Sequence, residues 1–383
     1  MLASVASKQM RHKACANAIK ASASSLEQKR NLHDLMLRKK TGQPFTRQGA
    51  GGRSTSNGHV ATVFGCTGFL GRYVVNRLAQ QGTQVVIAHR DPDEARPLKV
   101  TGDLGQIVPL EVDLKDRETI NEVVRHSDIV YNLIGRDYET KNYTFDQVHV
   151  DGARAIAEAC AENDVARLVH VSALNANEDS TSGFLRSKAR GEKAVREVIP
   201  GATIVRPGTM YGQEDRFLNR IGTGEGWQFW VNESKAKIRP VYAIDVAQAM
   251  EIFLTAESTI GKTYEFYGPK EYTYEQIFEL AREISKKPLP TYNVPTSIAK
   301  LAAKLVDRLP YNQMICPDLI ERMTLDDKPT PGALTFADLY IEPTDLDAVA
   351  IQFLRRFRST AIFDLPFEKG DGQVKKGVYH VID

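Results

Sequence analysis

The chain has 383 residues, of which 42% are hydrophobic and 26% charged, the composition of an ordinary folded protein. This composition excludes disorder as the main state, and no run of about 18 apolar residues is present to span a membrane. The formal net charge of +2 is unevenly distributed. Residues 1–53 hold eleven lysines and arginines against two acids, a net +9, whereas the remaining chain holds 39 against 46, a net −7.

Residues 1–25, MLASVASKQMRHKACANAIKASASS, are rich in alanine and serine and contain no acidic residue. This composition is typical of a mitochondrial transit peptide, and a basic tail that binds acidic surfaces or nucleic acid is the alternative. We predict a transit peptide over residues 1–30, with cleavage within residues 20–32, and no nucleic-acid partner. Cleavage after Arg30 removes six basic residues and Glu27, so the mature chain would carry −3 instead of +2.

Residues 31–57 form a basic, glycine-rich arm between this leader and the first strong structural pattern. We expect an extended segment without a core of its own. The arm is a candidate docking element on a neighbouring subunit or on anionic lipid, which would place the protein peripherally at a membrane. A solvated tail is the alternative.

Residues 58–258 alternate between short apolar runs and helical patterns. Six runs have the length and β-branched content of buried strands, namely HVATVF, QVVIAHR, IVPLEV, DIVYNLIG, RLVHVSAL and ATIVRPG. Helical patterns separate most of them, namely RYVVNRLAQQG, DRETINEVVRH, GARAIAEACAEN and SKARGEKAVREV. This alternation predicts an α/β fold with a doubly wound parallel sheet, a Rossmann domain that binds NAD(P).

A glycine-rich loop follows the first strand directly and opens the first helix. It reads Gly65-Cys66-Thr67-Gly68-Phe69-Leu70-Gly71, with glycines three residues apart. The first glycine permits the tight turn, the second lets the backbone approach a pyrophosphate, and the third permits close packing of the helix. The N-terminus of the helix then presents free N–H groups to the phosphates. We expect a dinucleotide at Gly65, Thr67, Gly68, Phe69, Leu70 and Gly71, and a purely structural turn is the alternative.

The end of the second strand bears on the choice of dinucleotide. Arg90 fits the 2′-phosphate of NADP(H) as a charged hydrogen-bond partner. Asp91 follows one residue later, so NAD remains an alternative cofactor. The alternative for Arg90 is a solvated surface arginine. We predict NADPH (NADP) as the cofactor.

The third and fourth strands supply further candidates. Asp113 and Leu114 follow the third strand, where Asp113 is placed to reach the adenine, although an N-cap of the next helix is the alternative. Ile134 and Gly135 end the fourth strand, where the nicotinamide ribose would pass.

Residues 259–383 are expected to form a smaller C-terminal lobe and tail, interleaved with residues 210–240 and stacked on the carboxyl edge of the sheet. Phe217 and the GEGWQFW segment would line a pocket beside the nicotinamide or provide aromatic packing between lobes. The cysteines are widely separated and form no CxxC pair, which argues against a disulfide framework or a metal site: Cys15, Cys66, Cys160 and Cys316.

The motifs GCTGFLG, VDL, NLIG, HVDGARAIAEA, VHVSALNA, FLRSK and VRPGTMYG, in this order, resemble the extended, atypical short-chain dehydrogenase/reductase superfamily over about residues 58–270. Within it, GGRSTSNGHVATVFGCTGFLGRYVVNRLA and IRPVYAIDVAQAM resemble the NADPH-binding accessory subunits of mitochondrial respiratory complex I, NADH:ubiquinone oxidoreductase, over roughly residues 50–360. The resemblance implies a matrix-side subunit of an inner-membrane complex, with other complex I subunits as partners, that supports assembly and stability near the quinone-reducing region. It also implies a nucleotide contact at Pro207.

Active members of the superfamily use a serine and a Tyr-x-x-x-Lys pair. Ser172 and Lys188 match the serine and lysine and are expected to contact the nucleotide, but Phe184 replaces the tyrosine. Reduction of a carbonyl needs a proton donor for the developing alkoxide, and a phenyl ring has no proton to give. The sequence therefore predicts a protein that binds the cofactor without catalysis.

Two alternatives remain open at this point. An active NADP-dependent reductase or epimerase would need a displaced phenol, for which Tyr138, Tyr143 and Tyr211 are candidates. A cofactor-sensing regulator would use the nucleotide to bias a conformational equilibrium. His149, where the superfamily often has asparagine, is expected to be a local hydrogen-bonding variant.

Overall fold

A computed structural model describes residues 33–37, 44–48, 56–223, 228–231, 235–286, 291–307 and 316–358. The predicted transit peptide and Cys15 lie outside the described residues, as do the side chains of the GEGWQFW segment. Of the predicted arm, two strands are described, β1 (His33–Leu37) and β2 (Pro44–Gln48), which pair antiparallel.

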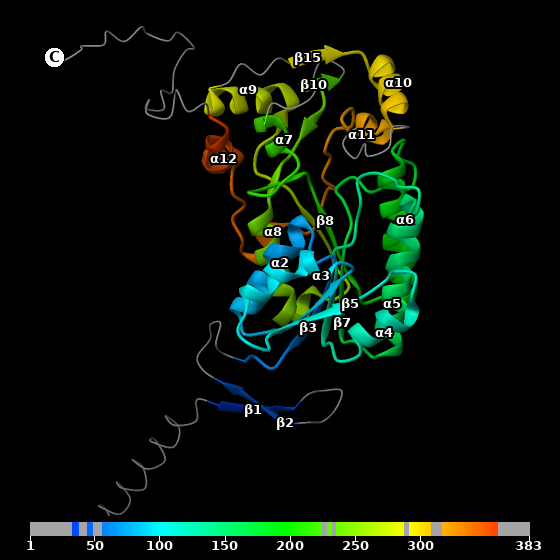
Figure 1. Cartoon of the computed structure of the whole chain (residues 1–383), viewed down its shortest axis with the longest axis vertical. Coiled ribbons are helices and arrows are strands. Elements are labelled where there is room, and N and C mark those ends of the chain that lie inside the picture. The colour runs from blue at the N-terminus through cyan, green and yellow to red at the C-terminus, as the bar shows by residue number, and fades with distance from the viewer. Residues whose placement is uncertain are drawn as a thin grey trace, which may run out of the picture.

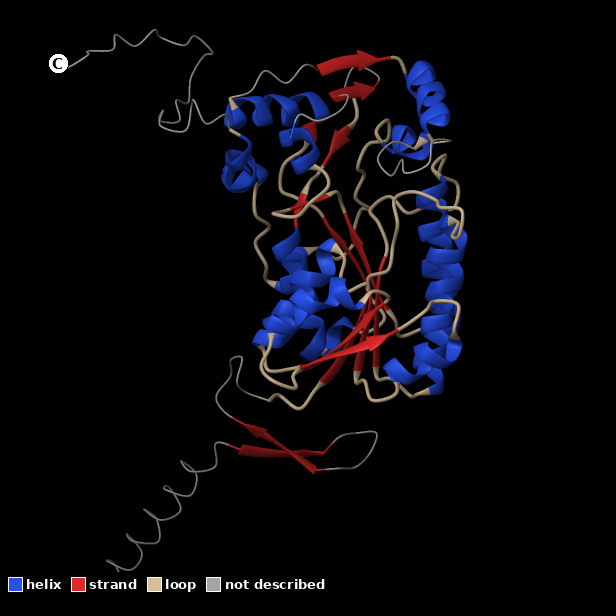
Figure 2. Cartoon of the chain, viewed as in Figure 1, coloured by secondary structure: helices blue, strands red, loops and turns tan. Residues whose placement is uncertain are grey.

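Seven parallel strands form the central sheet in the order β13-β8-β7-β6-β3-β4-β5 (Figures 1 and 2). The sheet confirms the predicted doubly wound fold, and each of the six predicted strand segments contains one of its strands. Their bounds are β3 (Val60–Phe64), β4 (Gln84–His89), β5 (Ile107–Glu111), β6 (Ile129–Asn132), β7 (Arg167–Val171), β8 (Thr203–Pro207) and β13 (Thr263–Phe266).

The strand order reverses at β3, which pairs with β4 on one side and with β6 on the other. In register, Phe64 at the end of β3 lies opposite Ala88 of β4 and Asn132 of β6. The loops that follow these three strands therefore leave the sheet side by side. In open α/β sheets, ligands bind at such a switch point, beyond the carboxyl ends of the strands.

Helices cover both faces of the sheet (Figure 1). On one face, α2 (Phe69–Gln80) packs against α8 (Ala243–Thr255). The other face is covered by α4 (Arg117–Val124), α5 (Gly152–Glu162) and α6 (Gly183–Val198). The helix predicted from residue 187 thus begins four residues earlier, because Ser182 is its N-cap and accepts a hydrogen bond from the Leu185 N–H at 3.4 Å.

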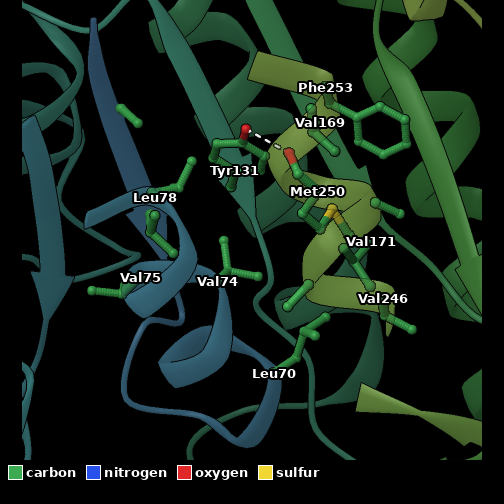
Figure 3. Close-up of a cluster of buried hydrophobic side chains, with 14 of the residues drawn as sticks. Leu70, Val74, Val75, Leu78, Tyr131, Val169, Val171, Val246, Met250 and Phe253 are labelled. Carbon is green, nitrogen blue, oxygen red and sulfur yellow. Dashed lines mark hydrogen bonds between the residues drawn. The ribbon is translucent and has the colours of Figure 1, made fainter. Parts of the chain in front are cut away.

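The core under α2 and α8 combines mostly aliphatic side chains of the two helices with side chains of the strands beneath them, as Figure 3 shows. The Tyr131 hydroxyl, at the centre of β6, is fully buried there and donates a hydrogen bond of 2.9 Å to the Met250 carbonyl of α8. The other labelled members are Leu70, Val74, Val75, Leu78, Val169, Val171, Val246 and Phe253.

The Rossmann sheet extends beyond the predicted domain boundary at residue 258. β13 pairs with β8 as its edge strand, with Tyr264 opposite Val205. The chain returns to this edge later, and Phe336 stacks on Phe266 with ring centres 4.3 Å apart. The predicted boundary is therefore wrong at this point, because a strand and a short helix from residues 259–383 complete the first domain.

The smaller C-terminal lobe lies beyond the N-terminal end of α6 (Figure 1). It contains α7 (Leu218–Thr223), α9 (Tyr274–Ser285) and α12 (Leu346–Leu354), which share one hydrophobic cluster. It also contains a parallel pair, β10 (Gln228–Val231) with β15 (Thr291–Val294), and the helices α10 (Thr296–Val306) and α11 (Pro317–Arg322).

Short elements complete the described chain. They are α3 (Pro92–Ala95), η1 (Arg96–Thr101), the π-helical turn η2 (Gln147–Asp151), β9 (Met210–Tyr211), β11 (Lys237–Ile238), β12 (Val241–Tyr242), η4 (Glu257–Thr259), β14 (Tyr272–Thr273), η5 (Phe336–Leu339) and η6 (Arg355–Phe357). Among the helices that the structure describes, none is both long and apolar enough to cross a bilayer.

Candidate functional site

The glycine-rich loop makes the turn from β3 into α2. Gly65 has a φ of +76°, and a Cβ on it would lie 3.0 Å from the carbonyl carbon of Leu133. A Cβ on Gly71 would lie only 2.3 Å from the Gly65 carbonyl oxygen. Both positions therefore require glycine, the first for its backbone conformation and its contact with the loop after β6, the second for close packing.

The first turn of α2 has features that favour the binding of an anion. Its N-cap, Gly68, has no side chain to cap the helix, and the first turn contains no acidic residue. The first N–H groups of a helix lack intrahelical partners, so those of Phe69 and Leu70 face the loop with the positive end of the helix dipole. Arg72 braces the loop, because its Nε donates to the Thr67 carbonyl at 3.1 Å. A pyrophosphate group fits this arrangement.

Arg90 and Asp91, at the end of β4, have different surroundings. Arg90 is exposed and forms no hydrogen bond or ion pair with any residue that the structure describes. Asp91 is the N-cap of α3, and its carboxylate accepts a hydrogen bond of 2.9 Å from the Asp93 N–H. The Asp91 carboxylate, which could otherwise bind the ribose of NAD, is thus hydrogen-bonded to the backbone, whereas the guanidinium of Arg90 remains available to a ligand.

Asp113, after β5, is not the cap of the next helix. Asp116 is that cap, and it accepts a hydrogen bond from the Glu118 N–H. Asp113 Oδ1 instead accepts from the Lys115 N–H at 3.0 Å and from the Tyr143 hydroxyl at 3.2 Å. The N-cap alternative for Asp113 is therefore wrong, and the carboxylate stands exposed at the sheet edge beside an aromatic ring.

Leu114 and Ile134 are partly buried and pack against the hydrophobic core under α4 and α5. A Cβ on Gly65 would lie 3.2 Å from the Ile134 backbone nitrogen, so the glycine loop and the loop after β6 are in contact. Pro207 ends β8, and its carbonyl accepts a hydrogen bond from the Leu174 N–H. These contacts place the backbone of Ile134 beside the glycine loop.

Ser172 and Lys188 come together at the end of β7. The Lys188 ammonium is buried and donates a hydrogen bond of 3.1 Å to the Val171 carbonyl. Burial lowers the pKa of Lys188 to about 8, although the carboxylates of Asp137 and Glu192 oppose this shift. The Ser172 hydroxyl is buried and has no hydrogen-bond partner among the described residues. A buried hydroxyl without a partner is costly, which indicates a ligand group at this position.

Phe184 lies in the first turn of α6, four residues before Lys188. Its ring is enclosed by the guanidinium of Arg322, 4.4 Å from the ring centre, and by the rings of His149 and Phe145, with centres at 5.3 and 6.1 Å. Only 9% of Phe184 is exposed. The position of the expected phenol is therefore filled by a packed phenyl ring.

His149 is hydrogen-bonded at both ring nitrogens. Its Nε2 accepts a hydrogen bond from the Arg136 N–H at 3.2 Å, so the proton of the neutral ring lies on Nδ1, which is 2.8 Å from the Ser187 hydroxyl. Burial, followed by the charge of Lys188, lowers the pKa of His149 to about 2. The ring therefore stays neutral and joins η2 to α6, as expected for a local hydrogen-bonding variant.

Two of the candidate replacement phenols are engaged elsewhere. The Tyr211 hydroxyl donates to the Thr344 carbonyl, and the Tyr143 hydroxyl donates to Asp113. Tyr138 lies under the guanidinium of Arg136, 5.4 Å from its ring centre. Phe217 packs on Tyr274 within the cluster of the C-terminal lobe, so its aromatic packing lies inside this lobe and not between lobes as the alternative had it.

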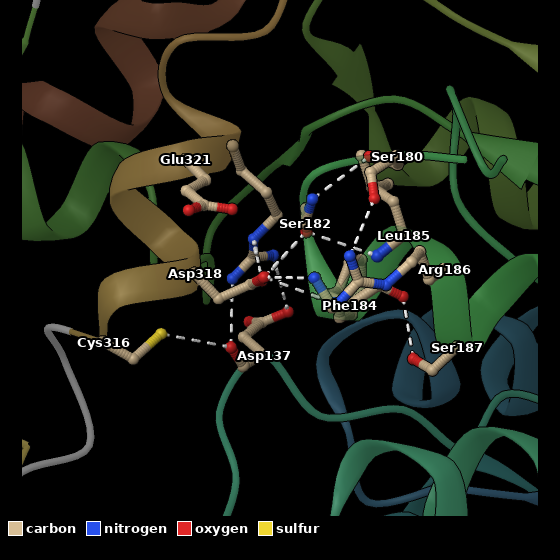
Figure 4. A network of polar contacts seen from close by, with 12 residues as sticks. Asp137, Ser180, Ser182, Phe184, Leu185, Arg186, Ser187, Cys316, Asp318 and Glu321 are labelled. Atoms are coloured by element: carbon tan, nitrogen blue, oxygen red, sulfur yellow. Dashed lines mark hydrogen bonds and ion pairs between the residues drawn. The ribbon is translucent and has the colours of Figure 1, made fainter. Parts of the chain in front are cut away.

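Asp137, Asp318 and Arg322 adjoin this site, and sequence analysis missed all three. They form a polar network with the start of α6, and Figure 4 labels Asp137 and Asp318 in it. No motif surrounds Asp318 or Arg322, and both lie more than 130 residues in sequence from the residues that they contact at α6 and in the loop after β6, so only the fold reveals them. No cluster of three potential metal-ligating side chains occurs among the residues that the structure describes.

The carboxyl edge of the sheet thus brings together the parts that a dinucleotide needs: a glycine turn at a helix N-terminus, an exposed arginine after β4, and a buried lysine beside an unpartnered serine. A nicotinamide dinucleotide fits these residues. The same edge offers no phenol at the position of Phe184.

Comparisons with known proteins agree with this geometry. The model of the NAD dependent epimerase/dehydratase family matches residues 61–266. The mitochondrial NADH-ubiquinone oxidoreductase 40 kDa subunit of Neurospora crassa is 47% identical over 340 residues, which cover 88% of this chain and 90% of that protein. The mitochondrial NADH dehydrogenase (ubiquinone) 1 alpha subcomplex subunit 9 of Rattus norvegicus is 40% identical over 316 residues, 81% of this chain and 84% of that protein.

Among solved structures, an NADPH-dependent quinone oxidoreductase from Escherichia coli, complexed with NADPH, superimposes with a TM-score of 0.62 at 20% identity. The match covers 77% of this chain and 99% of that one. At this identity the likeness supports the fold alone.

Proposed function

The chain belongs to the NAD dependent epimerase/dehydratase family and, within it, to the family of mitochondrial NADH-ubiquinone oxidoreductase subunits. From this membership we propose that it is a non-catalytic, NADPH-binding accessory subunit of complex I. The matched length supports a role for the whole protein, since the chain covers 84–90% of these two relatives.

One observation carries the non-catalytic part of the proposal: the nucleotide-binding elements are intact, whereas Phe184 is packed where a proton donor is needed. A bound nicotinamide would supply a hydride. The chain would also have to protonate the alkoxide, and neither the phenyl ring nor the neutral, hydrogen-bonded His149 can do so. Lys188 and Ser172 remain able to bind the ribose and the nicotinamide.

The preference for NADPH rests on Arg90 and Asp91. An acidic residue at the end of the second strand would accept the ribose hydroxyls of NAD, but the Asp91 carboxylate already caps α3. The exposed guanidinium of Arg90 matches a 2′-phosphate, which offers charged oxygens for two parallel hydrogen bonds.

We assign the nucleotide a structural role. Its binding site joins the ends of β3, β4, β6 and β7, so a molecule bound there connects segments that are distant in sequence. A ligand that binds only the folded state stabilises that state through its binding equilibrium. Such a subunit would support assembly and stability near the quinone-reducing region of the complex.

The proposed location is the matrix side of the mitochondrial inner membrane. The curated relatives bear mitochondrial names, and residues 1–30 have the composition of a transit peptide. The basic arm, residues 31–57, would dock on a neighbouring subunit or on anionic lipid.

Purification of the complex from mitochondria in mild detergent tests the proposal. We expect this chain to co-migrate with other complex I subunits and to release one NADPH per chain upon denaturation. A free monomer that oxidises NADPH with a carbonyl substrate would contradict the proposal and favour the active reductase or epimerase. Release of NADH alone would overturn only the assignment of the cofactor.

A further inference from the structure

Helix α11 of the C-terminal lobe lies against the nucleotide-binding elements and presents two charged side chains one turn apart. Asp318 and Arg322 form an ion pair along this helix, with Arg322 Nε 3.4 Å from Asp318 Oδ2. The start of α6 and the loop after β6 form two walls of the candidate site. Asp318, labelled in Figure 4, accepts a hydrogen bond from the first wall, and Arg322 donates one to the second.

Asp318 holds the start of α6. Its Oδ1 accepts hydrogen bonds from the Ser182 hydroxyl at 2.9 Å, from the Gly183 N–H at 2.7 Å and from the Phe184 N–H at 3.4 Å. A carboxylate at this position also interacts favourably with the positive end of a 16-residue helix. Lys188 lies one turn further along the same helix, so Asp318 fixes the element that carries it.

Arg322 holds the loop after β6. Its Nη2 donates to the Asp137 carbonyl at 3.0 Å, and its Nη1 lies 3.6 Å from the Asp137 carboxylate. The Cys316 thiol, just before α11, approaches the same carbonyl at 3.6 Å. The guanidinium also covers the Phe184 ring, so Arg322 contacts both walls.

The two walls meet at one contact inside the site. Gly135, two residues before Asp137, lies so close to α6 that its Cβ would be 3.0 Å from the Lys188 ammonium. The distance between the loop after β6 and α6 therefore fixes the positions of Gly135 and Lys188 relative to each other. Helix α11 is hydrogen-bonded to both of these elements.

We propose that Asp318 and Arg322 are positioning residues for the nucleotide: they hold Gly135 and Lys188 in the binding arrangement, so that docking of α11 and binding of NADPH favour each other. This inference rests on the proposed binding of NADPH. Coupling between two sites is reciprocal, so loss of the α11 contacts lowers nucleotide affinity by the same factor by which nucleotide favours docking.

Nucleotide titration of the purified full chain tests the first half of this coupling. We expect Arg322→Gln and Asp318→Asn each to weaken NADPH binding about tenfold, within the range typical of such coupling. Arg322→Lys, which keeps the charge and one donor, should restore part of the loss. Glu321→Gln is the matched control, because Glu321 lies on the same helix but pairs with Lys300 of α10, and it should bind NADPH as the unaltered chain does.

Amide hydrogen exchange tests the second half. We expect NADPH to slow amide exchange at residues 318–322 of the unaltered chain, a measurement that requires no variant. Without nucleotide, Arg322→Gln should speed exchange at residues 134–138, whereas Glu321→Gln should not. Unchanged exchange in α11 upon NADPH binding, or full NADPH affinity in a folded Arg322→Gln variant, would overturn the inference. If the unaltered chain binds no NADPH, the proposed function fails instead, and the exchange of the nucleotide-free variants still shows whether α11 holds the loop.

Discussion

The ammonium group of Lys188 lies 3.0 Å from the point that a Cβ on Gly135 would occupy. Lys188 is buried and bonded to the Val171 carbonyl, so it cannot move aside without losing that hydrogen bond. The contact joins the loop after β6 to helix α6 at the place where the nicotinamide ribose is expected.

Gly135→Ala is therefore expected to displace Lys188 and to weaken NADPH binding by about tenfold, equivalent to about 1.4 kcal/mol. Isothermal titration calorimetry on the nucleotide-free chain measures this affinity. Gly183→Ala is a suitable control, because a Cβ there would meet nothing closer than 3.7 Å. Equal affinities in the two variants would show that the Gly135–Lys188 contact does not shape the site.

Lys188→Met should separate stability from binding. Burial lowers the pKa of Lys188 from 10.5 to about 8, so the unfolded chain holds a proton between these pH values that the folded protein has released. The free energy of unfolding therefore rises with pH across this window, and below pH 8 the folded protein carries the full cost of a buried charge. Removing the charge should raise the free energy of unfolding at pH 7 by roughly 1–3 kcal/mol.

Urea unfolding between pH 7 and 11 measures the free energy of unfolding of Lys188→Met and of the unaltered chain. The tyrosines titrate in the same pH range, but they are common to both proteins, so their contribution cancels in the difference. NADPH affinity should fall in the same variant, because the ribose loses its cationic partner. Lys193→Met, an exposed position on α6, should change neither quantity. A loss of stability at pH 7 would mean that the hydrogen bond to Val171 outweighs the cost of burying the ammonium.

Arg90→Glu should abolish the preference for the 2′-phosphate. We expect NADPH affinity to fall by at least about a hundredfold, because a favourable charge pair becomes a repulsive one, whereas NADH affinity should be retained. Competition between the two nucleotides in a fluorescence titration measures the ratio. Arg96→Glu, a nearby exposed change of the same charge, controls for long-range electrostatics. If both nucleotides kept their affinities in Arg90→Glu, the assignment of NADPH to this arginine would be wrong.

The parts of the fold that sequence predicts well are those encoded locally. A β-branched run followed by glycines at residues 65, 68 and 71 specifies a strand, a turn and a helix within about 20 residues. The place of β13 in the central sheet escaped prediction, because it depends on pairing with β8, whose sequence lies some 60 residues earlier. Residue patterns carry little information on such distant pairing.

The candidate site divides in the same way. Ser172, Phe184 and Lys188 stand at motif spacing, so the sequence alone predicts that they belong to one site. The start of α6 has a local signal, since Ser182 is a favourable N-cap residue just before the FLRSK motif. Asp318 and Arg322 had none, because an i, i+4 ion pair on a short helix is usually a solvated surface feature.

The glycines of the loop should differ in what they support. A Cβ on Gly71 would lie 2.3 Å from the Gly65 carbonyl oxygen and 2.7 Å from the Cys66 backbone, so α2 must shift away from β3. We expect Gly71→Ala to lower the free energy of unfolding by about 3 kcal/mol or more. A Cβ on Gly68 meets only the Gly65 oxygen, at 3.2 Å, and its φ of −70° suits any residue, so Gly68→Ala should cost less than about 1 kcal/mol.

The effect on nucleotide affinity should not follow the effect on stability in Gly68→Ala and Gly71→Ala. The second glycine of such a loop lets the backbone approach the pyrophosphate, so Gly68→Ala should lose NADPH affinity while it remains folded. Urea midpoints and NADPH titrations on both variants provide the four values. Tight NADPH binding by Gly68→Ala would show that the pyrophosphate does not approach the N-terminus of α2, and the proposed nucleotide site would then have to be abandoned.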